Sequence, residues 1–493
     1  MTKRYFWLAL LFNVLLLSLR IYEISLERYA LYGDEAQYWT WAKALDWGYY
    51  SKPPVVAWLI AATTALFGDS SFAIRLSSPL LHFGTALIVY GIAVRLYSER
   101  TAFWASITFA SLPAVTLSST LISTDPALLF FWALSLYGLV RAESENALKW
   151  WIFTGIAAGF GALSKYSMLF FGASALLYFY WQGTAKQQLR NPKLWAGVVA
   201  TIAIYLPNLW WNAQHNFVSY LHTGDNAEGD GFGFFPGELF EFIAAQLAVF
   251  GPLLLGVLCL LLWRAARRRP EGKTALAVAF IAPMLSVILV ISLLSRAHAN
   301  WAAPIYIAAT LVVVNWLLER GLKWLLVISL LLHMGAACIF YHFDQSAKLA
   351  GIELTRKNDP FRRLKGGIEL ADAAAARMKL YPHAKIVSEE RRVVANLMYY
   401  LGEQTRAHGH TYRQPTIIYK WNAEGRIRDH YDLMTNMNAV KGADFLMITR
   451  TDSPKKFAPY FRSIETLKPI TIPLYRDYSL KYVVYLLKGF KGY

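Results

Sequence analysis

Residues 274–294 read TALAVAFIAPMLSVILVISLL, a run of twenty-one residues without a charged side chain. A helix of that length can cross the roughly 30 Å hydrocarbon core of a bilayer. Similar apolar runs recur through the first two-thirds of the 493-residue chain, which is 56% hydrophobic and only 16% charged. Soluble proteins carry about 25% charged residues, so this composition predicts a polytopic α-helical membrane protein.

The apolar runs predict about eleven spanning helices. The long segment after the first span holds two further helical patterns, one amphipathic at 34–45 and one short and apolar at 54–67. Neither is suited to crossing a bilayer, so we expect both to lie at the membrane interface. The spans are expected at 5–22, 77–96, 101–118, 126–142, 149–164, 166–182, 194–211, 241–263, 274–294, 303–319 and 323–341.

Basic residues between the apolar runs predict the orientation of the helices. The densest basic cluster lies within 264–273, and we place it in the cytoplasm together with Lys3 and Arg4 at the N-terminus. The net charge of +17 is therefore interpreted as a topology signal, and no nucleic acid is expected as a partner. The expected location is the cell inner membrane, with the C-terminal segment in the periplasm.

The composition changes near residue 345, which predicts two domains. Residues 1–341 should form the transmembrane domain, and residues 342–493 a soluble periplasmic α/β domain of a common size. The second domain shows a helical pattern at 366–379. Its strand-like runs lie at 384–388, 415–420, 443–449 and 482–487.

Two adjacent carboxylates follow the first span, in the stretch Tyr32-Gly33-Asp34-Glu35. Carboxylates close to lipid are costly to keep charged, so such a placement usually has a function. The structural alternative is that Asp34 caps the amphipathic helix, with Gln37 as the second half of a capping box. Both interpretations stay open for this motif taken alone.

Three cations and a third acid stand at helix ends on the same expected side of the membrane. Lys52 precedes two prolines that start the 54–67 pattern, and a helix N-terminus with a lysine can bind an anion. Arg75, Asp125 and Lys165 occupy the ends of later apolar runs. Each could instead be a cap or a side chain that extends to the interface, and only their joint arrangement favours a site.

Other polar residues of the outer loops could line a cavity. His298 and Asn300 lie between two spans, and His222 lies in the loop 212–240. A histidine in such a turn is more often structural than a ligand, so these residues receive no firm role.

The order of these motifs resembles a known family. A first helix, Asp34-Glu35, an amphipathic helix, Lys52 before two prolines, an arginine opening the next helix and Asp125 are similar to the lipid A aminoarabinose transferases and the wider protein O-mannosyltransferase-like group of the GT-C glycosyltransferases. The likeness covers about residues 1–340. It implies a GT-C fold with a C-terminal periplasmic domain.

The resemblance also implies roles for individual residues. Asp34 would be the catalytic carboxylate with Glu35 beside it, and Asp125 would be a second acidic residue of the same face. The carrier phosphate would be held by Lys52, Arg75 and Lys165. Apart from the resemblance, Tyr32, His298, Asn300 and His222 could line the cavity.

The implied reaction is inverting transfer of a sugar from a polyprenyl (undecaprenyl) phosphate to a lipid A-type or other envelope glycolipid. The sugar arrives activated, so no cofactor is required, although a divalent cation could bridge Asp34 and Asp125. Asp34 would be the general base for a hydroxyl acceptor, or would orient the sugar if the acceptor is a phosphate. The acids and cations are expected to meet in one pocket.

Other functions remain compatible with parts of the sequence. The first alternative is a protein O-glycosyltransferase of the same fold. A lipid or sugar transporter belongs to another class, but it would place ionisable residues near the bilayer midplane rather than at one face. A structural assembly subunit would not need paired lysines and carboxylates.

Overall fold

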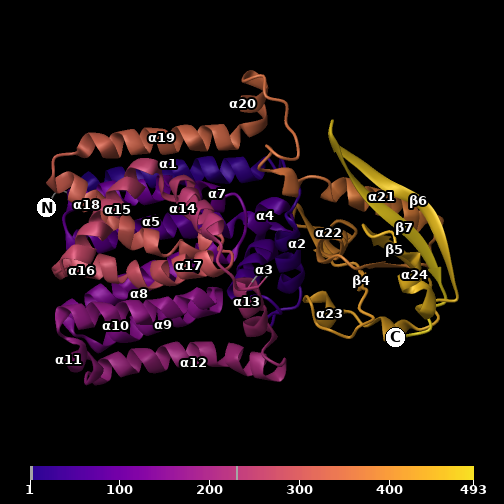
Figure 1. Cartoon of the computed structure of the whole chain (residues 1–493), viewed down its shortest axis with the longest axis horizontal. Coiled ribbons are helices and arrows are strands. Elements are labelled where there is room, and N and C mark those ends of the chain that lie inside the picture. The colour runs from indigo at the N-terminus through magenta and orange to yellow at the C-terminus, as the bar shows by residue number, and fades with distance from the viewer. Residues whose placement is uncertain (1–3, 229–230) are drawn as a thin grey trace. The chain divides into compact units, whose positions relative to one another are not determined.

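The computed structural model describes residues 4–228 and 231–493 (Figure 1), so Lys3 lies outside the described residues. The chain forms two compact units that are not continuous in sequence. The helical unit comprises the described residues up to Glu23, Lys52–Val56 and the described residues of Arg75–His342. The mixed unit comprises Ile24–Ser51, Ala57–Ile74 and Phe343–Tyr493.

The helical unit consists of helices that pack along one another around an apolar core. Its long neighbours in sequence, such as α8 and α9, lie side by side. The helices are α1 (Arg4–Ser25), α5 (Ser77–Leu96), α6 (Glu99–Ser111), α7 (Pro113–Ser118), α8 (Thr124–Glu145), α9 (Leu148–Ser164), η1 (Tyr166–Met168), α10 (Leu169–Gln182), α11 (Ala185–Leu189), α12 (Pro192–Gln214), α13 (Val218–Glu228), α14 (Pro236–Phe250), α15 (Pro252–Arg267), α16 (Gly272–Ala279), α17 (Ala282–Leu294), η2 (Ala299–Ala302), α18 (Ile305–Glu319) and α19 (Lys323–Tyr341).

Among the described residues, six helices are long and apolar enough to cross a bilayer, and a bent pair raises this number to seven. The predicted runs at 149–164, 166–182 and 303–319 are helical, as α9, α10 and α18, but they are shorter than that criterion. The multi-pass helical architecture is confirmed, whereas the expected total of eleven spans stays a prediction.

The prediction of one continuous helix at 241–263 is wrong. This run forms α14 and α15, which meet at an angle of 118°. Gly251 joins them with φ of +86° and ψ of 143°, a conformation that is open essentially to glycine alone. Pro252 then begins α15, where its missing N–H costs nothing. The bend therefore follows from the Gly-Pro pair.

The mixed unit contains a five-stranded sheet in the order β4-β1-β5-β7-β6. β1 runs parallel to β4 and β5, whereas β5, β7 and β6 are antiparallel neighbours. β6 and β7 form the long hairpin drawn in yellow in Figure 1. β2 and β3 form a separate antiparallel pair. The strands of the unit are β1 (Lys385–Ser388), β2 (Glu403–Ala407), β3 (His410–Gln414), β4 (Tyr419–Lys420), β5 (Phe445–Thr449), β6 (Ser463–Tyr475) and β7 (Tyr478–Lys488).

The helices of the mixed unit come from both ends of the chain. The predicted interfacial helices are present as α2 and α3, and α2 packs against α22 of the C-terminal segment. The helices are α2 (Gly33–Ala42), α3 (Val55–Phe67, which begins in the helical unit), α4 (Ser71–Arg75), α20 (Phe343–Leu349), η3 (Arg362–Leu364), α21 (Gly367–Leu380), α22 (Arg391–Tyr400), α23 (Tyr431–Met434), η4 (Met437–Val440), α24 (Pro454–Phe457) and η5 (Ala458–Tyr460).

Asp69 binds the first loop to the C-terminal segment. Its Oδ1 accepts a hydrogen bond from Trp39 Nε1 at 2.6 Å. Its Oδ2 accepts from Lys43 Nζ at 2.7 Å and from the backbone N–H of Arg413 at 2.8 Å. The Asp69 residue is 1% exposed, and a buried carboxylate needs such donors. The residues between the first and second predicted spans thus fold with the C-terminal segment.

The Gly251 bend gives a prediction for stability. In Gly251→Ala the new Cβ would lie 2.3 Å from His333 Nε2, and the positive φ would be strained by about 1–3 kcal/mol. We expect a lower midpoint of thermal unfolding in detergent. Gly256→Ala in α15 is the control, because its Cβ meets no atom within 4 Å and alanine favours helix by about 1 kcal/mol. Equal midpoints for both variants would contradict the account of the bend.

Candidate active site

Asp125 is the centre of a polar cluster in the helical unit. It lies in the first turn of α8, where its backbone N–H donates to Ser123 Oγ, and it is 7% exposed. Lys165, which follows α9, donates from Nζ to Asp125 Oδ1 at 2.6 Å. Asn300 of η2 donates from Nδ2 to Oδ2 at 2.6 Å. Three segments far apart in sequence therefore meet at one carboxylate.

Lys52 and Arg75 belong to the same unit. The charge of Lys52 acts on the Asp125 carboxylate, as that of Lys165 does more strongly. Arg75 ends α4 and is 4% exposed. A cluster with more cations than carboxylates, sheltered from water, attracts an anion strongly. The sequence-predicted residues Lys52 and Lys165 are thus suited to hold a phosphate.

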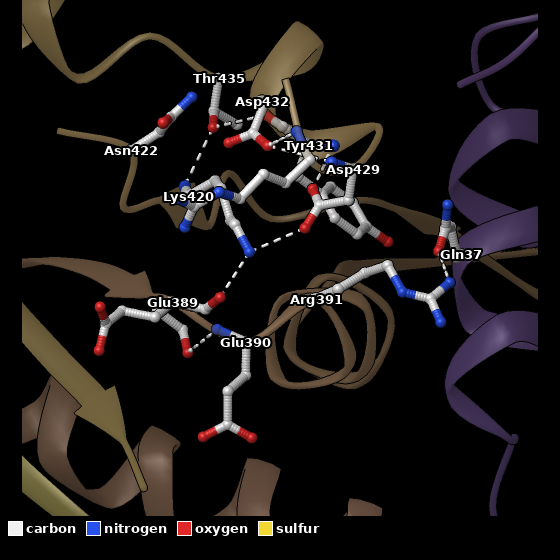
Figure 2. A network of polar contacts seen from close by, with 12 residues as sticks. Gln37, Glu389, Glu390, Arg391, Lys420, Asn422, Asp429, Tyr431, Asp432 and Thr435 are labelled. Atoms are coloured by element: carbon white, nitrogen blue, oxygen red, sulfur yellow. Dashed lines mark hydrogen bonds and ion pairs between the residues drawn. The ribbon is translucent and has the colours of Figure 1, made fainter. Parts of the chain in front are cut away.

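Asp34 lies in the mixed unit, where it forms an ion pair with Arg391. Asp34 is the second residue of α2 and Arg391 is the first of α22, and the Oδ1–Nη2 distance is 2.8 Å. Arg391 also donates to the amide oxygen of Gln37, toward which it extends in Figure 2. The Asp34 side chain is 32% exposed, so its carboxylate is oriented by the protein and still accessible.

Arg391 remains cationic in this position. Burial lowers the pKa of its guanidinium, but the Asp34 carboxylate, with smaller contributions from Tyr38 and Tyr431, raises the pKa above its usual value. The residue was not among the sequence-predicted site residues. Its only sequence signal is the charged run Glu389-Glu390-Arg391-Arg392, which gives no indication of a partner 357 positions away (391 minus 34).

Glu35 caps α2, and its expected catalytic role beside Asp34 stays a prediction. It is 1% exposed, and its Oε2 accepts a hydrogen bond from the backbone N–H of Tyr32 at 2.9 Å. This is the contact that a glutamate at the third helical position makes with the N-cap. The alternative of Asp34 and Gln37 as the capping pair is wrong, because α2 begins two residues earlier than that pairing requires.

The other predicted cavity residues lie in different surroundings. The Tyr32 hydroxyl accepts hydrogen bonds from Arg392 at 2.9 Å and from Arg363 at 3.4 Å, all in the mixed unit. His222 lies in α13 and contacts Asn226 Nδ2 at 2.9 Å, one helical turn away. His298 is exposed and its ring lies against that of Trp301. Of the four predicted cavity residues, Asn300 is hydrogen-bonded to Asp125.

A metal ion bridging Asp34 and Asp125 finds no further support in the contacts. Within the described ranges, no group of three or more His, Cys, Asp or Glu residues could hold a metal. Both oxygens of Asp125 already accept hydrogen bonds. Asp34 and Asp125 belong to different units, so their expected common pocket stays a prediction.

Comparison with known proteins identifies the class. Residues 51–211 match the family described as dolichyl-phosphate-mannose-protein mannosyltransferase. The fold is similar to that of ArnT from Cupriavidus metallidurans bound to undecaprenyl phosphate, with a TM-score of 0.67, 14% identity, and coverage of 99% of this chain and 98% of that one. Apo ArnT gives a TM-score of 0.64. The fold is that of a GT-C-type membrane glycosyltransferase.

Sequence relatives narrow this class to a family. The chain is 34% identical over 394 residues to the lipid A galacturonosyltransferase RgtD of Rhizobium johnstonii, a match covering 78% of this chain and 80% of the relative. It is 29% identical over 236 residues to the undecaprenyl phosphate-alpha-4-amino-4-deoxy-L-arabinose arabinosyl transferase of Pseudomonas aeruginosa, covering 44% of this chain and 41% of the relative. The chain belongs to the glycosyltransferase family that contains RgtD.

The Asp125–Lys165 pair gives a prediction about stability. It distinguishes the effect of breaking the ion pair from the effect of removing a lysine side chain. Lys165→Met leaves a sheltered carboxylate without its cation, which costs about 3–5 kcal/mol. We expect a clear fall in the thermal midpoint in detergent. The double variant Asp125→Asn with Lys165→Met should recover much of that loss, because the uncompensated charge is gone.

The matched control is Lys149→Met. Lys149 is an exposed lysine at the start of α9, the helix that Lys165 follows. Its effect should stay within about 0.5 kcal/mol. A double variant no more stable than Lys165→Met would show that the pair does not govern stability.

Proposed function

We propose that this protein is an inverting glycosyltransferase that moves a sugar from undecaprenyl phosphate to a lipid A-type glycolipid at the periplasmic face of the cell inner membrane. The observation that carries the proposal is the likeness to a lipid A galacturonosyltransferase across 80% of its length. The relative named for an undecaprenyl phosphate donor supports the choice of carrier.

The Asp125 cluster is the proposed phosphate site. When the glycosidic bond breaks, the carrier phosphate gains negative charge, which Lys52 and Lys165 stabilise. Asp125 and Asn300 fix the position of the Lys165 ammonium before the donor arrives. Arg75 is assigned to the same site, since it lies in the same unit close to the start of α5. No cofactor enters this scheme, because the donor carries its own activation.

An apolar cavity suits the prenyl chain of the donor. Its volume is about 790 Å³, and it lies along α9, α10 and α12 in the helical unit. Its lining runs along α9 from Trp151 to Ala162 and includes Tyr166 of η1, which directly follows Lys165 in the chain. A lipid phosphate held by Lys165 would thus have an apolar surface next to it for its hydrocarbon chain.

Asp34 is the proposed catalytic carboxylate. If the acceptor is a hydroxyl, Asp34 takes its proton as the oxygen attacks the anomeric carbon from the face opposite the phosphate, which inverts the configuration. If the acceptor is a phosphate, already ionised near neutral pH, Asp34 orients the sugar. Arg391 keeps the carboxylate ionised and correctly aimed in either case. The mechanism requires that Asp34 reach the sugar attached to the bound phosphate.

A protein acceptor is the second candidate, since the family matched by residues 51–211 is named for protein mannosyltransferases. That match spans a third of the chain, whereas the lipid A-modifying relative covers most of it. Mass analysis of envelope lipids and proteins from cells with and without this protein separates the two. A sugar lost from lipids supports the proposal, and a sugar lost only from proteins contradicts it.

Substitution of Asp34 tests the catalytic assignment. Asp34→Asn should lower transfer by about 10²–10⁴-fold, the usual contribution of a general base, with the thermal midpoint nearly unchanged. The assay uses purified protein in detergent, a defined undecaprenyl-phosphate sugar and lipid A, with the product measured by mass spectrometry. No membrane gradient is present, so a transporter would form no product.

Glu35→Gln makes the same chemical change one residue away. Glutamine keeps the capping contact to the Tyr32 N–H, so most of the transfer should remain. Full activity in Asp34→Asn, or equal losses in both variants, would refute the assignment of Asp34.

Filling the apolar cavity tests the donor site. Gly172 lines it, and a Cβ atom added there meets no atom within 4 Å. Gly172→Trp should raise the KM for the long-chain donor about tenfold by occupying the space of the prenyl chain. Gly256→Trp, at another unobstructed helical glycine outside this cavity, should leave the KM unchanged. An unchanged KM in both variants would place the chain elsewhere.

A further inference from the structure

The mixed unit contains a second cavity, with a volume of about 600 Å³. All its lining residues belong to this unit. They come from the start of α2, from the segment 356–370, from the start of α22, from the end of β5 and from the β6–β7 hairpin. Seven of them are arginines or lysines. Lys365 is paired with Asp359, and the other six are exposed: Arg356, Lys357, Arg362, Arg363, Arg392 and Arg450.

The cavity has far more positive than negative charge. Its single acidic lining residue, Glu390, lies 3.3 Å from Arg450. In Figure 2, Glu390 and Arg391 extend in different directions from the chain. Within the described residues, the five exposed lining cations other than Arg450 form no ion pair with a carboxylate. Like charges gathered around a concave surface focus a positive potential that attracts anions.

A helix start adds backbone donors to this field. Gly366 and Gly367 line the cavity at the beginning of the fourteen-residue α21. The first turn of a helix presents unpaired N–H groups and partial positive charge. Gly366 has φ of +89°, and a Cβ there would lie 2.6 Å from the Leu480 side chain. The backbone angle and the nearby Leu480 side chain therefore both favour glycine at this position.

The remaining lining suits a sugar rather than a bare ion. Three tyrosines, Tyr475, Tyr478 and Tyr482, line the same cavity, and their rings offer flat apolar faces with polar edges. Asn396 also lines it, and the buried Oδ1 atom of its amide accepts no hydrogen bond from the described residues. That oxygen could accept one from a ligand hydroxyl.

The cavity adjoins the proposed catalytic carboxylate within the same unit. Gly33, the residue before Asp34, lines it. Arg392 lines it as well, whereas its neighbour Arg391 binds Asp34. A ligand whose anionic group is bound in this cavity could therefore extend to Asp34.

From these observations we infer that this cavity is the acceptor subsite, which binds the phosphorylated or carboxylated saccharide head group of the glycolipid. The inference rests on the proposed function for its acceptor, but the site is defined by its own charge and shape. Charge-assisted hydrogen bonds from arginines, often bidentate, recognise phosphate and carboxylate alike.

Direct binding to the full-length protein in detergent tests the subsite. The probe is the glucosamine disaccharide 1,4′-bisphosphate without acyl chains, compared with the same disaccharide lacking phosphate. The bisphosphate should bind and the neutral disaccharide should bind at least about tenfold more weakly. The triple variant Arg356→Gln, Lys357→Gln, Arg362→Gln should lose about tenfold in affinity for the bisphosphate, while the thermal midpoint remains near that of the parent.

The matched control is Arg406→Gln, Arg426→Gln, Lys468→Gln, which removes three exposed cations of the same unit outside the cavity. It should bind the bisphosphate as the parent does. Equal affinity of the two triple variants for the bisphosphate would overturn the subsite. The subsite would also be overturned if phosphatidylglycerol vesicles or inorganic phosphate competed for the cavity as strongly as the head group does. Bisphosphate binding that depends on the cavity, in a protein inactive with every donor, would support the subsite while refuting the proposed transferase reaction.

Discussion

A carboxylate withdrawn from water must be matched by donors, and two such carboxylates, together with the partly exposed Asp34, organise this protein. Asp125 is held between Lys165 and Asn300 in the helical unit. Asp69 is held by Trp39, Lys43 and a backbone N–H in the mixed unit. Asp34 alone combines a cationic partner with substantial exposure. The satisfied pairs give rigidity, and the accessible one is available for chemistry.

This pairing explains why the first loop belongs to the C-terminal part of the fold. Through Asp69 and the contact of α2 with α22, the loop that carries Asp34 folds with a segment more than three hundred residues later. The proposed acceptor subsite and the proposed base therefore share one unit, whereas the proposed donor phosphate site and prenyl cavity share the other. Such a division would let acceptor choice vary through the C-terminal segment while the donor site stays the same.

The sequence predicts the architecture well because burial in lipid leaves a strong signal. Uncharged runs such as 274–294 locate the membrane helices, and the change in composition locates the α/β segment. The bend at Gly251 is missed because hydropathy carries no information about the backbone angle φ. Strand β6 is missed because Pro469 and Pro473 interrupt its pattern, and an edge strand tolerates prolines that a central strand would not. The meeting of Asp34 with Arg391 is a tertiary event that no local pattern encodes.

The proposed mechanism depends on the Asp125 cluster holding the carrier phosphate. The most direct test is a cryo-electron microscopy map of the protein in lipid nanodiscs with undecaprenyl phosphate bound. The account predicts phosphate density within hydrogen-bonding distance of the ammonium groups of Lys52 and Lys165, with the prenyl chain continuing along α9 past Tyr166. Phosphate density away from both lysines would contradict it.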